Sequence, residues 1–221
     1  MNRRTILSAA ALLLSIALAS CATATTVVPG ANSTSQPVLI ATISGGSSPV
    51  AVPAGSSALA CSSGSTSASL TPELTEGPFF KANSPERASL LDASTPGTQL
   101  VITGTVYGTD CKPVAHALLD FWQADASGVY DNSGYTLRGH QYTDANGHYQ
   151  LTTIVPGLYT GRTEHIHVKV QAPNGQLITT QLFFPGVAQN DSDGIYNPAL
   201  LLAIQPGSNP EQAQYNFVVP T

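Results

Sequence analysis

Charge is scarce in this chain of 221 residues, because only 10% of them are Asp, Glu, Lys or Arg. After Arg4 the next charged residue is Glu73, so residues 5–72 contain no charged side chain. All five histidines also lie beyond this gap. Such asymmetry separates a leader and a tether from a folded domain, which we expect over residues 69–221. A domain of about 150 residues is long enough to bury a sizeable core.

Basic clusters and long apolar runs are missing as well. Of the eight Lys and Arg residues, Arg3 and Arg4 precede the gap, which leaves six in the expected domain against 13 Asp and Glu. No basic patch is present, so nucleic-acid binding is not expected. The apolar run over residues 6–19 is short for a membrane span, but it has the length of a secretory h-region. We therefore expect an exported protein.

The leader, residues 1–21, ends in a short processing signal. Residues 18–21 (LASC) are typical of a bacterial lipobox, in which the cysteine is diacylated and becomes the new N-terminus. Cys21 is the expected lipidation site, and the chain is expected to be anchored by lipid to the cell envelope, in the periplasm or at the cell surface. The alternative is an ordinary signal peptide with a chance cysteine. Arg3 and Arg4 fit either a twin-arginine signal or a plain basic n-region.

Only two cysteines remain once Cys21 is assigned. Residues 22–68 are mostly Ala, Ser, Thr, Gly, Pro and Val, without charge or aromatic side chains, which predicts a flexible tether. Cys61 and Cys111 are then an even pair in an oxidising compartment. We expect a disulfide between them that pins the end of the tether to the domain.

Long helices are not indicated, because no extended apolar pattern of period 3.6 occurs. Gly104 marks a bulge or a close backbone approach, and Asn146 with Gly147 is a hairpin signal. Residues 70–80, with two prolines and a glycine, predict an extended segment able to cross the mouth of a pocket. Strands are expected at residues 99–107, 117–123, 149–154, 165–170, 177–184, 200–204 and 215–219. Short strands with frequent turns predict an all-β sandwich with an irregular N-terminal segment.

Two histidines begin one of these strands. His165 and His167 are two residues apart, so their side chains project to one face while Ile166 and Val168 face the core. Neutral imidazole is the commonest metal ligand in proteins. The pattern alone fits a metal site, and it also fits a half-exposed strand whose polar face carries two histidines.

A zinc hydrolase built on these histidines would need a third protein ligand. Cysteine is not available, and Glu164 should face the other side of the strand. The other histidines lie in turns or at strand ends, where we expect surface residues: His116, His140 and His148. The sequence therefore offers no convincing third zinc ligand.

Tyrosines are better candidates for further ligands. Tyr159 stands at a Pro-Gly turn six residues before His165, and Tyr130 follows the strand that contains Trp122. A phenol suits Fe(III), because a trivalent cation favours the phenolate despite a usual pKa near 10. A core or rim tyrosine is the alternative for Tyr130.

Several segments, in order, resemble the intradiol ring-cleavage dioxygenases, the catechol and protocatechuate dioxygenase family. They are residues 71–80 (TPELTEGPFF), 121–130 (FWQADASGVY), 137–139 (LRG), 143–147 (TDANG), 153–159 (TIVPGLY), 165–170 (HIHVKV) and 180–184 (TQLFF). The resemblance covers about residues 70–200 and implies a prealbumin-like β-sandwich. The lipobox and tether resemble an exported branch of the family. Residues 185–196 are shorter than in many relatives, which puts pocket depth and subunit contacts in doubt.

The resemblance also implies a site. Tyr130, Tyr159, His165 and His167 match the ligands of a non-haem Fe(III), and Tyr159 matches the axial ligand that leaves when substrate binds. Arg162 matches the arginine that stabilises the carbanion-like form of the bound catecholate.

Further positions match residues around the substrate. Gln181 matches a polar residue near the reacting ring. Pro78, with Thr75 and Gly77 around it, matches the segment that lines the substrate pocket. Trp122 matches a tryptophan behind the site, and a core anchor is an equal alternative.

The function implied is cleavage of a catechol-type ring between its two hydroxylated carbons by Fe(III) and O2, giving a cis,cis-muconate-type product. The partners would be the catechol, O2 and the membrane that holds the lipid anchor. The rival is a non-catalytic cell-surface β-sandwich lipoprotein with a binding function. It fits the tether and the anchor equally well, but it leaves the Tyr, Arg and His set unexplained.

Overall fold

The computed structural model describes residue 61, residues 65–205 and residues 207–221. Within them, nine strands form two sheets, so the predicted all-β sandwich is confirmed. The leader, the expected lipidation site Cys21 and most of the tether lie outside the described residues. Among the described residues, no helix is long and apolar enough to span a bilayer.

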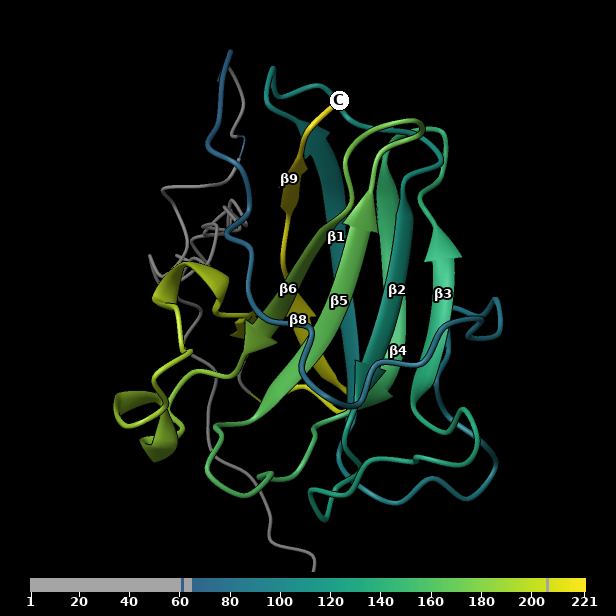
Figure 1. Ribbon diagram of the computed structural model, residues 1–221, viewed down its shortest axis with the longest axis vertical. Helices are drawn as coiled ribbons and strands as arrows, with labels where there is room; N and C mark the ends of the chain where they lie inside the picture. The colour runs from purple at the N-terminus through teal and green to yellow at the C-terminus, as the bar shows by residue number, and fades with distance from the viewer. Residues whose placement is uncertain (1–60, 62–64, 206) are drawn as a thin grey trace, which may run out of the picture. The chain divides into compact units, whose positions relative to one another are not determined.

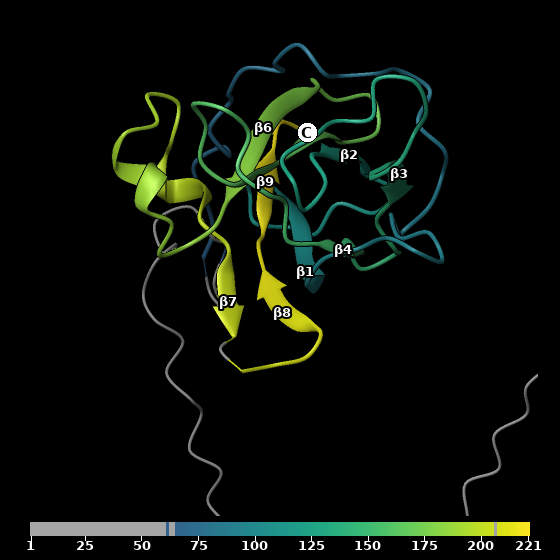
Figure 2. The ribbon, with the colours of Figure 1, turned by 90° about the horizontal axis from the view of Figure 1, so that it is seen from below.

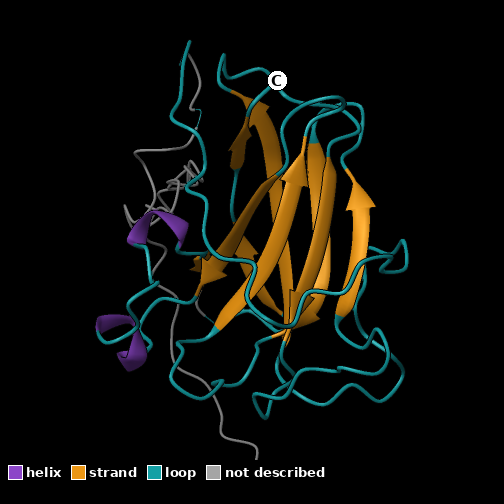
Figure 3. Cartoon of the chain, in the orientation of Figure 1, coloured by secondary structure: helices purple, strands orange, loops and turns teal. Residues whose placement is uncertain are grey.

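The two sheets form separate layers, which Figure 1 shows one behind the other and Figure 2 shows from below. The four-stranded sheet has the order β3-β2-β5-β6, with β2 at Leu118–Gln123, β3 at Arg138–Tyr142, β5 at His165–Gln171 and β6 at Ile178–Phe183. The five-stranded sheet has the order β4-β1-β8-β7 with β9 beside β1; the strands are β1 (Gln99–Gly108), β4 (His148–Ile154), β7 (Ala203–Gln205), β8 (Glu211–Gln214) and β9 (Phe217–Val219). Two short 3-10 helices, η1 (Ala188–Asp191) and η2 (Pro198–Leu200), follow β6 and lie at one side of the sandwich (Figure 3).

Apolar side chains at alternate strand positions fill the space between the layers. Ile166 and Val168 of β5 and Phe121 of β2 are fully buried there. Each such side chain contributes about 1.5–3 kcal/mol when removed from water. The close approach expected at Gly104 is confirmed, because a Cβ there would overlap the carbonyl oxygen of Tyr215.

The outer face of the four-stranded sheet carries polar and aromatic side chains in register. One row runs Arg138, Trp122, His167 and Gln181 across β3, β2, β5 and β6. Residues 70–98 contain no helix. Their first part crosses this face, as the blue segment in front of the sheet shows (Figure 1), and residues 86–90 then pair with β3 and with β4 of the other sheet. The row therefore lies under a cover that the N-terminal segment supplies.

The hairpin predicted at Asn146 and Gly147 is wrong. The tight turn exists, since the Gly147 N–H donates to the Asp144 carbonyl oxygen at 3.0 Å. However, β3 and β4 on either side belong to different sheets, so the turn carries the chain from one layer to the other. Turn residues specify a reversal of the chain and not the partner of the next strand.

The disulfide expected from the cysteine count is present. Cys61 is bonded to Cys111, with Cα atoms 5.3 Å apart, and the Ala68 N–H donates to the Thr109 carbonyl oxygen at 3.0 Å. Residues 65–68, placed in the tether by composition, thus lead directly into the domain from a covalent attachment.

Candidate metal centre

Three polar side chains converge where β5 begins. Strand alternation sends His165 and His167 to the outer face, and their Nε2 atoms are 3.1 Å apart. Tyr130 comes from the loop after β2, and its Oη is 3.3 Å from Nε2 of His165. Tyr159, in the loop before β5, lies edge-on to Tyr130 with ring centroids 5.9 Å apart. The structure thus brings together the donor atoms of three expected ligands and places the Tyr159 ring beside them.

His165 is oriented to act as a ligand, whereas Nδ1 of His167 has no hydrogen-bond partner among the described residues. Nδ1 of His165 is 2.6 Å from the Thr163 carbonyl oxygen, which can only accept, so the proton lies on Nδ1 and the lone pair on Nε2. Burial lowers the pKa of His165 to about 4. Burial, and then the neighbouring His165, lower the pKa of His167 well below its usual value. Two neutral imidazoles therefore face each other in a buried site.

The phenol of Tyr130 is held in its neutral form. Burial raises its pKa to about 12, although the cationic side chains Arg162 and Arg138 act in the opposite direction. At neutral pH the hydroxyl ionises only if a stronger cation lies beside Oη. A highly charged metal ion is such a cation.

Aromatic rings surround these donors. Phe79 stacks on Tyr130 with centroids 4.3 Å apart, and Trp122 stacks on His167 at 4.8 Å with an interplanar angle of 8°. Gly77 has a φ of +70°, and a Cβ there would lie 3.4 Å from Cε1 of His167. The N-terminal segment therefore closes on the site through a glycine and a phenylalanine. Pro78, expected in the substrate pocket, lies exposed between them.

Arg162 is clamped from two sides. Its Nε donates to Oδ2 of Asp193 at 2.8 Å, and one terminal nitrogen donates to Oε1 of Gln181 at 2.7 Å. Gln181 in turn donates to the Thr75 carbonyl oxygen at 3.0 Å. Sequence reasoning named three of these residues and missed Asp193. The missed carboxylate also accepts the Thr163 N–H at 2.9 Å, so it holds the residue whose carbonyl oxygen, in the next peptide group, contacts Nδ1 of His165.

Asp193 remains ionised in this position. Burial alone would raise its pKa, but the N–H groups of Thr163 and Ile195 and the Arg162 guanidinium lower it below the usual value. The charge of the carboxylate thus balances that of the guanidinium.

The comparison with known proteins agrees with this geometry. A family model described as Dioxygenase matches residues 75–203. The chain belongs to the intradiol dioxygenase family. It is 35% identical over 142 residues to catechol 1,2-dioxygenase 2 of Acinetobacter lwoffii, covering 52% of each chain. It is 33% identical over 108 residues to the protocatechuate 3,4-dioxygenase beta chain of Burkholderia cepacia, covering 41% of this chain and 46% of the relative.

Solved structures of the same family share the fold. One is the dioxygenase domain of a dioxygenase and carbohydrate-binding protein fusion from the cellulolytic bacterium Streptomyces sp. SirexAA-E, with 50% identity and a TM-score of 0.67 over 69% of this chain and 99% of that one. An intradiol ring-cleavage dioxygenase from Tetranychus urticae has 27% identity and a TM-score of 0.64 over 69% and 94%. The chain spans about half the length of the catechol dioxygenases it matches.

The donors of this intradiol dioxygenase fit a metal ion. Two ligand atoms that are each about 2.1 Å from a metal ion, with an angle of about 95° between the two bonds, lie about 3.1 Å apart. The two Nε2 atoms are 3.1 Å apart, and the Tyr130 oxygen is 3.3 Å from Nε2 of His165. Within the described residues, no three His, Cys, Asp or Glu side chains form a metal-binding group. The donors that accompany the histidines are phenols, which suit Fe(III).

The remaining histidines take no part in the site. His116 and His148 are exposed, as expected. The expectation for His140 is wrong: it lies half-buried within β3, with Nδ1 2.8 Å from the Ser84 carbonyl oxygen. Its role is to fix the N-terminal segment on the sheet.

Proposed function

We propose that this intradiol dioxygenase opens catechol-type rings between the two hydroxylated carbons with Fe(III) and O2, and releases a cis,cis-muconate-type diacid. The convergence of the Tyr130 oxygen and two imidazole nitrogens beside Arg162 carries the proposal. The relatives named as catechol, chlorocatechol and hydroxyquinol dioxygenases support the substrate class.

Tyr130, Tyr159, His165 and His167 would hold the iron. Ferric iron bound by two phenolates supplies Lewis acidity that prepares a catecholate for attack by O2. The buried aromatic surroundings would limit access of water and strengthen each electrostatic interaction with the substrate. Phe79 and Trp122 supply these surroundings.

Arg162 and Tyr159 act on the substrate itself. The guanidinium, aimed by Asp193 and Gln181, offsets the negative charge that develops on the ring, which is the kind of term that dominates many catalysed reactions. With iron bound, Tyr159 would be present as the phenolate, and its oxygen would be the base that takes one of the two catechol protons. Both residues border a hollow of about 190 Å³ with Leu158 and Gln189, where a ring substituent would emerge.

We also propose that the protein works outside the cytoplasm, anchored through Cys21. The Cys61–Cys111 disulfide supports an oxidising compartment. Catechols released outside the cell would then reach the site without crossing a membrane.

The test combines metal analysis, spectroscopy and oxygen uptake on the purified full chain. We expect one iron per chain, a wine-red colour from phenolate-to-iron charge transfer, and oxygen consumption with a ring-opened diacid as product for part of a panel of catechols. A colourless protein with stoichiometric zinc would contradict the proposal. An iron-free protein that consumes no oxygen after reconstitution with iron would instead support the rival binding lipoprotein.

A further inference from the structure

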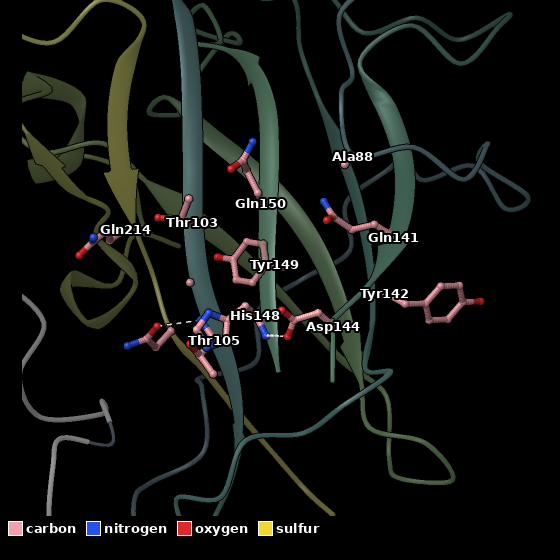
Figure 4. A pocket seen from close by; sticks show the side chains of 12 residues that line it. Ala88, Thr103, Thr105, Gln141, Tyr142, Asp144, His148, Tyr149, Gln150 and Gln214 are labelled. Carbon is pink, nitrogen blue, oxygen red and sulfur yellow. Dashed lines mark hydrogen bonds between the residues drawn. The ribbon is translucent and has the colours of Figure 1, made fainter. Parts of the chain in front are cut away.

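A cavity of about 590 Å³ lies over the five-stranded sheet and shares no residue with the metal centre. Its floor is the outer face of β4, β1 and β8, since the alternate residues Ile102, Leu151 and Ala213 are buried in the core. The cavity is lined by side chains and backbone from three segments and the C-terminal part of the chain (Figure 4): Ala88, Thr103, Gly104, Thr105, Gln141, Tyr142, Asp144, His148, Tyr149, Gln150, Gln214 and Asn216. Its volume lies in the range of ligand-binding cavities.

Polar side chains form rows on the floor. Thr103 is in register with Gln150 of β4 and with Gln214 of β8, so a hydroxyl lies between two carboxamides on adjacent strands. Neighbouring strands are about 4.8 Å apart, which gives the row a flat, regular spacing. Beside it, Thr105 is in register with His148, and its N–H donates to Oδ1 of Asn216 at 2.9 Å.

Several of these groups have hydrogen-bonding capacity left over. Gln141 is only 8% exposed, and its Nε2 has no hydrogen-bond partner within the part of the chain that the structure describes. Figure 4 shows its amide pointing from β3 toward Tyr149 and Gln150. A buried donor without a partner destabilises the fold, so its presence needs an explanation. Within the described residues, the exposed side chains of Gln150 and Gln214 make no hydrogen bond to another protein group.

The charge of the lining limits the ligand. No Lys or Arg lines the cavity, so an anion would find no cation. The carboxylate of Asp144 already accepts the N–H groups of Asn146 and His148 through one oxygen, at 2.8 Å each. An apolar ligand would bury the carboxamides without partners. A neutral ligand with many hydroxyl groups satisfies both donors and acceptors of the carboxamides.

We propose that this cavity is a binding site for a neutral carbohydrate, independent of the metal centre and of the reaction there. The row of Gln150, Thr103 and Gln214 would pair with successive hydroxyl groups, and Gln141 would donate from the wall. Such a site would hold the enzyme on a glycan while the opposite face of the sandwich acts on a small aromatic substrate.

The test is retention of the full chain on insoluble neutral glycans (cellulose, xylan, chitin and starch) and titration with the matching soluble hexasaccharides. We expect at least one glycan to be bound. The double variant Gln150→Ala with Gln214→Ala should weaken binding about tenfold or more, since two hydrogen bonds are lost. Thr103→Tyr, which fills the floor without removing an amide, should weaken it as well. Gln176→Ala, at an exposed residue outside the cavity, is the matched control and should bind normally.

Oxygen consumption should be unchanged in these variants, because the cavity and the metal centre share no residue. Three results would each overturn the proposal: no neutral glycan bound at millimolar concentration, equal binding by the double variant and the Gln176→Ala control, or preference for an acidic glycan such as polygalacturonate.

Discussion

Asp193 should control both Arg162, the arginine proposed to act on the substrate, and His165, a proposed metal ligand, and Asp193→Asn tests this. One carboxylate oxygen accepts from Arg162 and from Thr163, and the other accepts the Ile195 N–H at 2.9 Å. Asparagine has a single acceptor oxygen, so in either orientation an NH2 group faces an N–H donor. The substitution also removes the charge that balances the Arg162 guanidinium.

The expected loss of stability in Asp193→Asn follows from the burial of the Asp193–Arg162 pair. The Asp193 side chain is 2% exposed and that of Arg162 is 17% exposed. Breaking a fully buried pair costs about 3–5 kcal/mol, and since Arg162 keeps Gln181 we expect the free energy of unfolding to fall by about 2–3 kcal/mol. The melting temperature should fall by roughly 5–10 °C. A guanidinium displaced by about 1 Å should lower kcat about 100-fold with a smaller change in KM. Loss of the hydrogen bond to the N–H of Thr163, the residue whose carbonyl oxygen contacts His165, should weaken iron binding about 10-fold.

Steady-state oxygen uptake, iron titration and thermal melting check these numbers. Asp191→Asn is the control, because Asp191 is an exposed acid in the same segment. In a double-mutant cycle with Arg162→Gln, the two effects on kcat/KM should be far from additive if Asp193 acts through the arginine. Additive effects, or values equal to those of the Asp191→Asn control, would refute the reasoning.

Three further predictions concern other contacts. Tyr130→Phe should lose the visible absorption and most of the iron, whereas Tyr142→Phe, at an exposed tyrosine, should keep both; iron retained by Tyr130→Phe would remove Tyr130 from the ligands. Gly77→Ala should weaken iron binding and lower stability, because it combines a left-handed φ with a contact to His167. Gly186→Ala, with a φ of +78° and nothing within 4 Å, is the control for backbone strain alone, and equal iron affinities would contradict the contact. Cys111→Ser opens a disulfide between residues 50 apart in sequence and should reduce the free energy of unfolding in urea by about 2–4 kcal/mol; an unchanged value would show that the bond adds no stability.

The strand that carries the histidines could be predicted because its information is local. Alternation of period two places Ile166 and Val168 in the core and both histidines on one face, and the structure agrees. β3 and β8 were not predicted. β3 (Arg138–Tyr142) lacks alternation and contains Gly139, and β8 (Glu211–Gln214) has low strand propensity. Their strands form because neighbours with stronger patterns fix their positions, and that information is not local.

The residues of the candidate site also differ in whether local sequence information could identify them. Tyr159, Arg162 and the two histidines lie within nine residues, so spacing alone places them together. Asp193 is one acid in a loop without strand or helix pattern, and its partners Arg162 and Thr163 lie 31 and 30 residues earlier in the chain. No local signal distinguishes it from the exposed Asp191. The relevant signal was that residues 185–196 are shorter than in many relatives. It identified the segment that contains Asp193, but not Asp193 itself.

The N-terminal segment that covers the candidate metal centre is attached to the sandwich at several points. Thr71 is fixed to β9 by two hydrogen bonds with Val218, at 2.9 and 2.8 Å. Further along, Leu74 is bonded to Thr179, and the Glu76 carboxylate is paired with Lys169. Each attachment lies between the disulfide and the residues that contact the ligands.

A displacement that reaches the domain through the tether would therefore meet a covalent bond first and then this series of contacts, before it reached Gly77 and Phe79. Rigid support of ligand-orienting groups is what a site needs when a misplacement of about 1 Å costs about 100-fold in rate. Along the chain, the Cys61–Cys111 bond thus stands between the tether and the segment that covers the candidate site.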